Sequence, residues 1–338
     1  MTYSSGGLIQ ALDFNNLVGP STTASTTANA VNTIWAIGSR EWGYGQTVIS
    51  NVNANATVQS ENWASLINTI NSIATHQGTT FTTALTPPAD NDKITYLASL
   101  KNNINKIYDR RNNAAAQGLT QSTSTRFTSS AWHNSITFKF TITFSTGDKA
   151  RYFFNSGGQL AINFTHAATG GINTIFNNLC ADCGTIVLSA MSGTQQATIA
   201  GTTYNGTTRV GGTGDVTTLN TTLGYYSLTA EDKLLFRKNP NKAGIAPSFL
   251  EYVASTISVY AKVSGAQGQH GDAGSIITLT AVWEQSPNTE NVAPGNDTGP
   301  VNNSTTTVAV RYPKSTTSGG VLTNTWGVAT VTGSVAGN

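Results

Sequence analysis

The sequence predicts an α+β fold in three parts: a small helical region, then an antiparallel β-sandwich, then an extended C-terminal β arm. Apolar residues recur at helical spacing through the first third of the chain, whereas short runs of alternating apolar and polar residues between Gly-rich turns fill most of the remainder. A polar stretch rich in Pro, Asn and Gly, SPNTENVAPGNDTGPVNNS, precedes the last strands. The predicted domains are a helical attachment region at residues 1–121, a β-sandwich at 122–285, and a linker with a strand arm at 286–338.

Composition argues against several classes of protein. Only 10% of the 338 residues are charged, and the formal net charge of +2 provides no basic field that would gather nucleic acid. The first residues lack a basic segment leading into an apolar core, and no apolar run approaches the roughly 20 residues of a membrane span. We therefore expect no nucleic-acid partner and no membrane insertion, and a soluble protein made in a cytoplasm.

Two longer helices are predicted in the helical region, after short helical pieces that end by Gly38. The first begins at Ser60 and ends before Gly78, and the second opens at Asp90 or Asp92 and ends at Gly118. Each carries a narrow apolar stripe. Two interpretations stay open: the stripes dock on a partner protein, or they pack on one another and on the sandwich. The candidate docking surface consists of Trp63, Leu66, Ile67, Ile70, Ile94, Leu97, Ile104 and Ile107.

The clearest strand pattern spans residues 135–144, where isoleucine and phenylalanine alternate with polar residues. Alternation resumes at residues 160–164 after turn-forming residues, so the two runs are predicted to pair as antiparallel neighbours. The intervening ARYFFNSGG holds three consecutive aromatic residues, which cannot share one face of a strand; this predicts a core corner that crosses between packed layers. A short helix is expected at residues 172–179. Further strands are predicted at residues 185–191, 196–204, 224–228, 233–237, 257–263, 277–283, 307–312 and 320–331.

No motif for catalysis or cofactor binding stands out in the sequence. Cys180 and Cys183 form a CxxC without the second pair of ligands that a structural zinc site needs, so buried thiols or a loop are expected. Acidic residues such as Asp148, Asp182 and Asp272 fall in predicted turns, where hydrogen bonds to the backbone explain them. We expect no catalytic residue, cofactor or metal and no enzyme, with a carbohydrate-cleaving pair of carboxylates left open because such pairs assemble in space.

Four stretches of the sequence resemble a known family: GGLIQALDFNNLVG, WGYGQ, WASLINTINSIATHQGT and, above all, KARYFFNSGGQLAINF. They are similar to virion structural proteins of tailed bacteriophages, a group well represented among phages of cyanobacteria. The resemblance spans roughly the first 285 residues, and RYFFNSGG is its most specific part. It implies a particle component of the tail, fibre or baseplate type, with no enzymatic role and no catalytic residues to carry over.

The expected role is therefore a non-enzymatic structural component of a phage virion, at the tail as a fibre, baseplate or neck protein. A weakly charged surface and the C-terminal arm favour a homo-oligomer, with a trimer before other states, that docks on other virion proteins. The alternatives are a capsid decoration protein and a carbohydrate-binding module for host recognition. In that module a host surface glycan would be a further partner, stacking on Trp42, Tyr44, Tyr204 or Tyr225.

Overall fold

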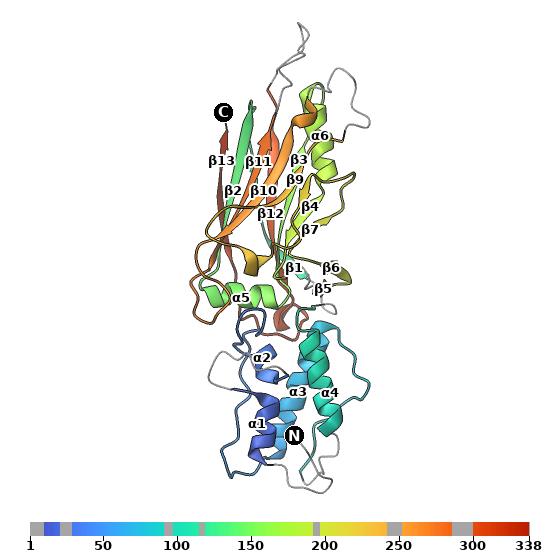
Figure 1. Ribbon diagram of the computed structural model, residues 1–338, viewed down its shortest axis with the longest axis vertical. Helices are drawn as coiled ribbons and strands as arrows, with labels where there is room; N and C mark the ends of the chain where they lie inside the picture. Colours follow the sequence, from blue (N-terminus) through green and yellow to red (C-terminus); the bar gives the residue numbers. More distant parts are fainter. Residues whose placement is uncertain are drawn as a thin grey trace.

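The computed structural model describes residues 10–20, 29–90, 97–114, 119–191, 197–241, 252–285 and 300–337. The first four helices gather at one end of an elongated molecule and the long strands at the other, with α5 (Gly147–Asn155) lying between them (Figure 1). This arrangement confirms the predicted α+β fold with a β-sandwich. Within the described ranges, no helix is both long and apolar enough to cross a membrane.

The helical region matches the sequence pattern closely. Its helices are α1 (Ala11–Val18), α2 (Val31–Trp35), α3 (Ser60–Gln77) and α4 (Leu97–Asp109). Gly78 ends α3 in the left-handed conformation, with φ 66°, which glycine adopts without strain. α4 ends at Asp109 rather than at Gly118. Beyond it, Ala114 forms a β-bridge to Ile199 of β5 (Ala197–Ile199), which requires an extended backbone at that residue. The alternative opening residue Asp92 lies outside the described residues.

The candidate docking surface lies inside the helical region. Its described side chains are each at most 3% exposed: Trp63, Leu66, Ile67, Ile70, Ile104 and Ile107. Trp63 packs edge-on against Phe14 of α1, with ring centroids 5.3 Å apart. Ile94 and the side chain of Leu97 lie outside the described residues. The stripes thus pack within the fold, which corresponds to the second of the two interpretations, and they are not free for a partner.

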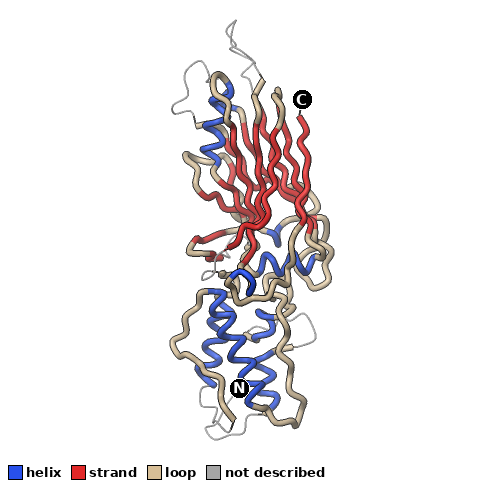
Figure 2. The backbone as a smooth tube through the Cα atoms, turned by 180° about the vertical axis from the view of Figure 1, so that it is seen from behind, coloured by secondary structure: helices blue, strands red, loops and turns tan. Residues whose placement is uncertain are grey.

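Two antiparallel sheets make the sandwich (Figure 2). The five-stranded sheet has the order β1 (Leu119–Thr128), β12 (Ser304–Pro313), β3 (Gln159–His166), β4 (Thr185–Leu188) and β7 (Thr207–Val210). The six-stranded sheet has the order β13 (Thr330–Gly337), β2 (Ser135–Thr143), β11 (Ile276–Glu284), β10 (Thr256–Val263), β9 (Lys233–Lys238) and β8 (Thr218–Leu219). A small separate sheet pairs β5 with β6 (Thr202–Tyr204).

Apolar side chains at every second position of the strands fill the space between the two sheets. On β2, Phe138 and Phe140 are fully buried whereas Lys139 between them is exposed. Trp283 of β11 stacks on Phe176 of α6 (Ile172–Cys183), with ring centroids 5.9 Å apart and planes 16° from parallel. The short helix predicted near residues 172–179 therefore packs against the sandwich core.

The predicted pairing of β2 with β3 is wrong. β2 pairs with β11 and β13, whereas β3 pairs with β12 and β4 in the other sheet. The segment between them crosses from one sheet to the other as predicted, but as the helix α5 rather than as a strand corner. Helical geometry buries Phe153 and Phe154 while the Tyr152 ring packs against Gly45 of the helical region, so the three aromatics do not have to share a face.

The C-terminal segment is not a separate arm. β12 lies between β1 and β3, with Val308 opposite both Thr125 and Ile162, and β13 extends the other sheet beside β2. Both sheets therefore include strands from residues 300–337. Two predicted strands also differ: residues 225–227 form the 3-10 helix η1 (Tyr225–Ser227), and β13 begins only at Thr330. The other predicted strands overlap strands of the structure.

Candidate functional site

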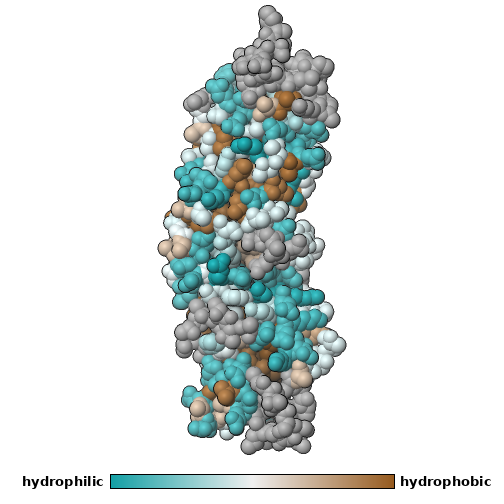
Figure 3. Space-filling view, in the orientation of Figure 1, coloured by the Kyte–Doolittle hydropathy of each residue, from teal (hydrophilic) through white to brown (hydrophobic). Residues whose placement is uncertain are grey.

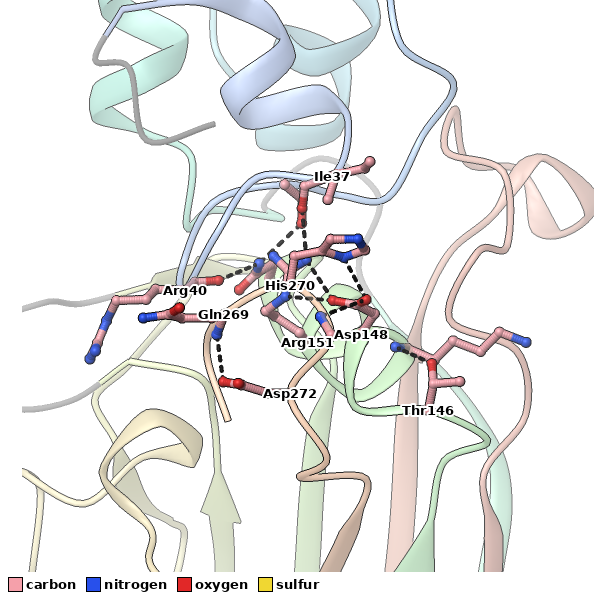
Figure 4. Close-up of polar contacts among 12 residues, drawn as sticks. Ile37, Arg40, Thr146, Asp148, Arg151, Gln269, His270 and Asp272 are labelled. Atoms are coloured by element: carbon pink, nitrogen blue, oxygen red, sulfur yellow. Dashed lines mark hydrogen bonds and ion pairs between the residues drawn. The ribbon is translucent and has the colours of Figure 1, made fainter. Parts of the chain in front are cut away.

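Polar contacts around α5 join the helical region to the sandwich (Figure 4). The sequence GDKARYFFN starts a helix here because Thr146 caps it, its Oγ1 accepting from the Lys149 N–H at 3.2 Å. Asp148 lies in the first turn, where a negative charge suits the helix dipole. We use the name junction cluster for Asp148, Arg151, Asn155, Tyr226 and His270.

Arg151 occupies the centre of the junction cluster, with only 1% of its surface exposed. Its guanidinium donates to the carbonyl oxygens of Trp42 at 2.9 Å and Ile37 at 2.8 Å, in the loop that follows α2. Its Nε and Nη2 donate to Asp148 Oδ1 at 3.2 and 2.9 Å, so the buried charge is balanced. A planar guanidinium with several fixed donors suits this arrangement, in which one side chain ties α5 to the backbone of the helical region.

Asn155 lies one turn further along α5 and holds the same loop. Its Nδ2 contacts the carbonyl oxygens of Arg40, Trp42 and Gly43 at 3.0, 3.1 and 3.0 Å. The Tyr226 hydroxyl lies 2.6 Å from both Asn155 Oδ1 and the Arg40 carbonyl oxygen, and it donates to one of them at a time. Burial raises the pKa of Tyr226 well above its ordinary value, which keeps this hydroxyl a donor.

Asp148 also reaches the loop that precedes β11. Its Oδ2 accepts from the Gly271 N–H at 3.2 Å and pairs with His270 Nδ1 at 2.7 Å. Nearby, the backbone N–H of Arg40 donates to the carbonyl of Gly268 in the same loop. One carboxylate therefore connects α5, a sandwich loop and, through Arg151, the helical region.

The WGYGQ loop depends on two glycines. Gly43 has φ 93°, and a Cβ there would overlap the Ile37 carbonyl; Gly45 has φ 71°, and the Tyr152 ring occupies the place of its Cβ. Between them Tyr44 is buried, and its hydroxyl donates to the Arg111 carbonyl oxygen at 2.6 Å. The loop that Arg151 and Asn155 hold is therefore shaped by residues of the motif itself.

A third segment joins the junction from the C-terminal side. Gln46 Nε2 donates to the Thr323 carbonyl oxygen at 3.0 Å, and Gln46 Oε1 accepts from the Thr323 N–H at 2.8 Å. Thr325 Oγ1 donates to the Tyr44 carbonyl oxygen at 3.0 Å. The loop between β12 and β13 is thus bound to the same stretch of the helical region as α5.

His76 lies beside the junction, in the last turn of α3 and edge-on to Tyr44 at 5.1 Å. Burial lowers the pKa of His76 to about 4, and the nearby backbone of Ser156 offsets this only in part. The ring is therefore neutral at neutral pH. Both of its nitrogens lack a well-formed hydrogen bond within the described part of the chain, as do the side-chain polar atoms of Ser156 and Gln159.

The aromatic residues expected to stack on sugars are mostly internal. Tyr44, Tyr204 and Tyr225 are buried, and Tyr225 stacks on Phe154 with ring centroids 4.3 Å apart. Trp42 is half-buried, and the guanidinium of Arg111 covers its ring at 5.5 Å. These four residues do not form an exposed sugar-stacking platform.

Both cysteines are free and buried near the end of α6, as expected for buried thiols. Burial raises the pKa values of Cys180 and Cys183, which favours the neutral thiols over the thiolates that redox chemistry uses. Within the described ranges, no group of three or more His, Cys, Asp or Glu side chains is arranged to hold a metal ion.

The junction cluster was not predicted as a site. The sequence pattern places Asp148 in a turn and gives no signal for His270 or Tyr226, because contacts between loops far apart in the chain leave no local pattern. Two of the stretches that carry the family resemblance, WGYGQ and KARYFFNSGG, meet at this junction. A scan against protein-family models finds no match, and comparisons with curated proteins and with solved structures find no significant match.

Proposed function

We propose that the protein is a non-enzymatic structural component of a tailed-phage virion, associated with the tail as a fibre, baseplate or neck protein. It acts as a homo-oligomer that docks on other virion proteins. The observation that carries this proposal is the position of the stretches on which the family resemblance rests. KARYFFNSGG supplies Arg151 and Asn155, and WGYGQ supplies the loop that they hold. The resemblance therefore covers the residues that fix the two regions relative to each other.

The physical character of the molecule supports a connecting role. Side-chain to backbone hydrogen bonds at the junction are directional, so they select one orientation of the helical region on the sandwich. Only 10% of the residues are charged, so the surface has little electrostatic attraction for charged ligands. Such a surface is compatible with packing against other proteins. On the face drawn in Figure 3, hydrophilic residues predominate and hydrophobic residues lie in small groups.

The helical region is proposed as the attached end and the sandwich as the projecting end. The apolar stripes of α3 and α4 are internal, so attachment would use the outer surface of the helical region. The last strand, β13, ends at the end of the sandwich that is remote from α1 to α4 (Figure 1). This separation makes the orientation measurable by labelling.

The test is labelling of purified particles of the phage that encodes the chain. One virus carries a peptide tag after residue 338, and a matched virus carries it in the exposed loop at residues 53–57. Immunogold electron microscopy should place both labels on the tail, with the C-terminal label farther from the particle surface. Label on the capsid instead would support a decoration protein, and particles without any label would overturn a virion role.

A further inference from the structure

The four outer strands of the two sheets differ in how they limit pairing with other chains. An exposed strand edge offers unpaired backbone groups, and proteins commonly protect such edges by shortness, bulges, charges or proline. β8 has 2 residues; β7 has 4 and includes Arg209. β1 carries the exposed Arg126 and a register shift between Gln121 and Thr123. Three of the four outer strands therefore carry at least one such feature.

β13 has none of these features. It runs for 8 residues, TVTGSVAG, pairs on one side with β2 without a register shift, and contains no charged residue and no proline. It forms the open margin of the six-stranded sheet in Figures 1 and 2. Six of its residues are exposed, and only Val331 and Val335 are partly buried.

The sequence of β13 is nearly symmetrical about Gly333. Val331 and Val335 lie two residues to either side and face the core, opposite Ile142 and Phe138 of β2. Thr332 and Ser334 flank the glycine on the outer face. An antiparallel pair of two such strands centred on Gly333 would place valine opposite valine and hydroxyl opposite hydroxyl, the like-with-like matches that stabilise cross-strand neighbours. The neutral strand would bring no like charges together.

Gly333 fits the centre of such a pair. The Phe127 ring of β1 lies over it on the inner face, where a Cβ would be 2.6 Å from Cε2. The ring occupies the place of a Cβ on the inner face, so a glycine fits here, while Gly333 remains exposed at the strand edge.

From these observations we infer that β13 is a self-association edge: it pairs antiparallel with β13 of a second copy of this chain about a twofold axis at Gly333. The two six-stranded sheets become one continuous sheet across this contact. Such a contact is isologous, because each copy contributes the same strand. The inference rests on the homo-oligomer in the proposed function and gives it a site. The trimer expected from the weakly charged composition is a separate prediction. A trimer requires a particle of three chains in solution, whereas the β13 pair requires a particle of two.

The first experiment measures mass by sedimentation equilibrium at micromolar concentration. The full chain should have twice its 35.4 kDa mass. In the variant Thr332→Glu/Ser334→Glu, carboxylates lie opposite one another across the pair, which should raise the dissociation constant by about tenfold or more. The matched control Ser124→Glu/Thr128→Glu makes the same charge change at exposed sites on β1 and should stay dimeric. A monomeric or trimeric wild type, or an undiminished dimer in the β13 variant, overturns the inference.

Disulfide trapping tests the register without relying on a destabilised variant. Thr332 of one copy should lie opposite Ser334 of the other, at a Cα separation of about 4.5–5.5 Å, within the range that a disulfide spans. A mixture of Thr332→Cys and Ser334→Cys proteins should cross-link, whereas each variant alone should not, and the native thiols are buried. Equal cross-linking in the mixture and in the pure samples would contradict the register.

Failure of this inference is distinguishable from failure of the proposed function. A wild type that is monomeric in solution yet present in particles overturns the β13 pair and leaves the virion role standing. A dimer that never enters particles supports the pair and overturns the virion role.

Discussion

The helical region and the sandwich bury their apolar residues through different kinds of neighbours. In the helical region, the core comes from helices that follow one another along the chain, such as α3 and α4, with their stripes facing inward. In the sandwich, β12 inserts between β1 and β3, and β13 pairs with β2, so the last strands complete sheets begun much earlier. Contacts in the helical region join residues that are close in the sequence, whereas contacts in the sandwich join residues that are far apart. The sandwich should therefore be the slower part to fold.

Directional polar contacts cross the junction between these regions, beside a hydrophobic core that continues from one region into the other. Arg151, Asn155 and Gln46 all hydrogen-bond to backbone groups across it. Such contacts contribute modest net energy while intact, but a buried partner left unsatisfied is costly. The two regions should therefore unfold together while the junction cluster is intact and separately once it is lost.

The largest expected effect is in the sandwich core. Phe140 is fully buried on β2 and contacts Phe127, with ring centroids 5.3 Å apart. Phe140→Ala should lower the free energy of unfolding by about 3–5 kcal/mol, because it removes a large ring and leaves a cavity. Urea unfolding measures this change, with Thr141→Ala on the outer face of the same strand as the control. A loss below about 1 kcal/mol would mean that the strand is peripheral to the core.

A smaller loss of stability is expected at the junction. Arg151→Met removes the guanidinium but keeps much of its volume, leaving the Ile37 and Trp42 carbonyls and the Asp148 carboxylate without that partner. The expected cost is about 3 kcal/mol, concentrated in the helical region. Hydrogen exchange should show faster opening of α1 to α4 than of the sandwich strands, and Arg151→Lys should fall between. Equal acceleration in both regions would contradict a local role.

The pH dependence of stability should come partly from His76. Its pKa is lowered from 6.5 to about 4 in the folded protein, so between those values the unfolded chain binds more protons than the folded one. The stabilisation is therefore complete above pH 6.5 and is lost as the pH falls towards 4. At pH 5 the loss should be about 2 kcal/mol relative to pH 7.

Comparison with His76→Phe isolates this contribution, because phenylalanine keeps a ring against Tyr44 and does not titrate. Burial also lowers the pKa of His166, so the variant should retain part of the acid dependence. Thermal melts at pH 7 and pH 5 should show a smaller decrease in Tm for the variant. An unchanged decrease would argue against a neutral His76.

The smallest effect is expected at the C-terminal contact of the junction. Gln46→Ala removes both hydrogen bonds to Thr323 and should cost about 1 kcal/mol. The neighbouring exposed Thr47→Ala serves as the control. Chemical denaturation of both variants decides the point, since equal midpoints would show that the loop between β12 and β13 adds little to the junction.

The sequence predicted elements better than it predicted their neighbours. The stripe of α3 and the alternation of β2 were correct because helical and strand periodicity are local properties. The pairing of β2 with β3 was wrong because the local helix signals, the Thr146 cap and Asp148 in the first turn, do not show that the helix crosses from one sheet to the other. The arm after residue 285 was likewise wrong, since a polar linker in the sequence does not reveal that β12 returns to the middle of a sheet.

The candidate docking surface shows the same limitation. An apolar stripe on a helix predicts burial but does not identify the partner, and here the partners lie within the same region of the fold. The junction cluster could not be predicted either, because Arg151 and Asn155 bind backbone carbonyls, which any residue would provide.

Differential scanning calorimetry tests the central claim, that the junction cluster couples the helical region to the sandwich. The wild type should give one transition whose calorimetric and van't Hoff enthalpies agree. The variant Arg151→Met/Asn155→Ala should give two transitions. The first should coincide with a loss of the helical circular-dichroism signal, because the helical region unfolds first. Two transitions in the wild type, or a single one in the variant, would contradict the account.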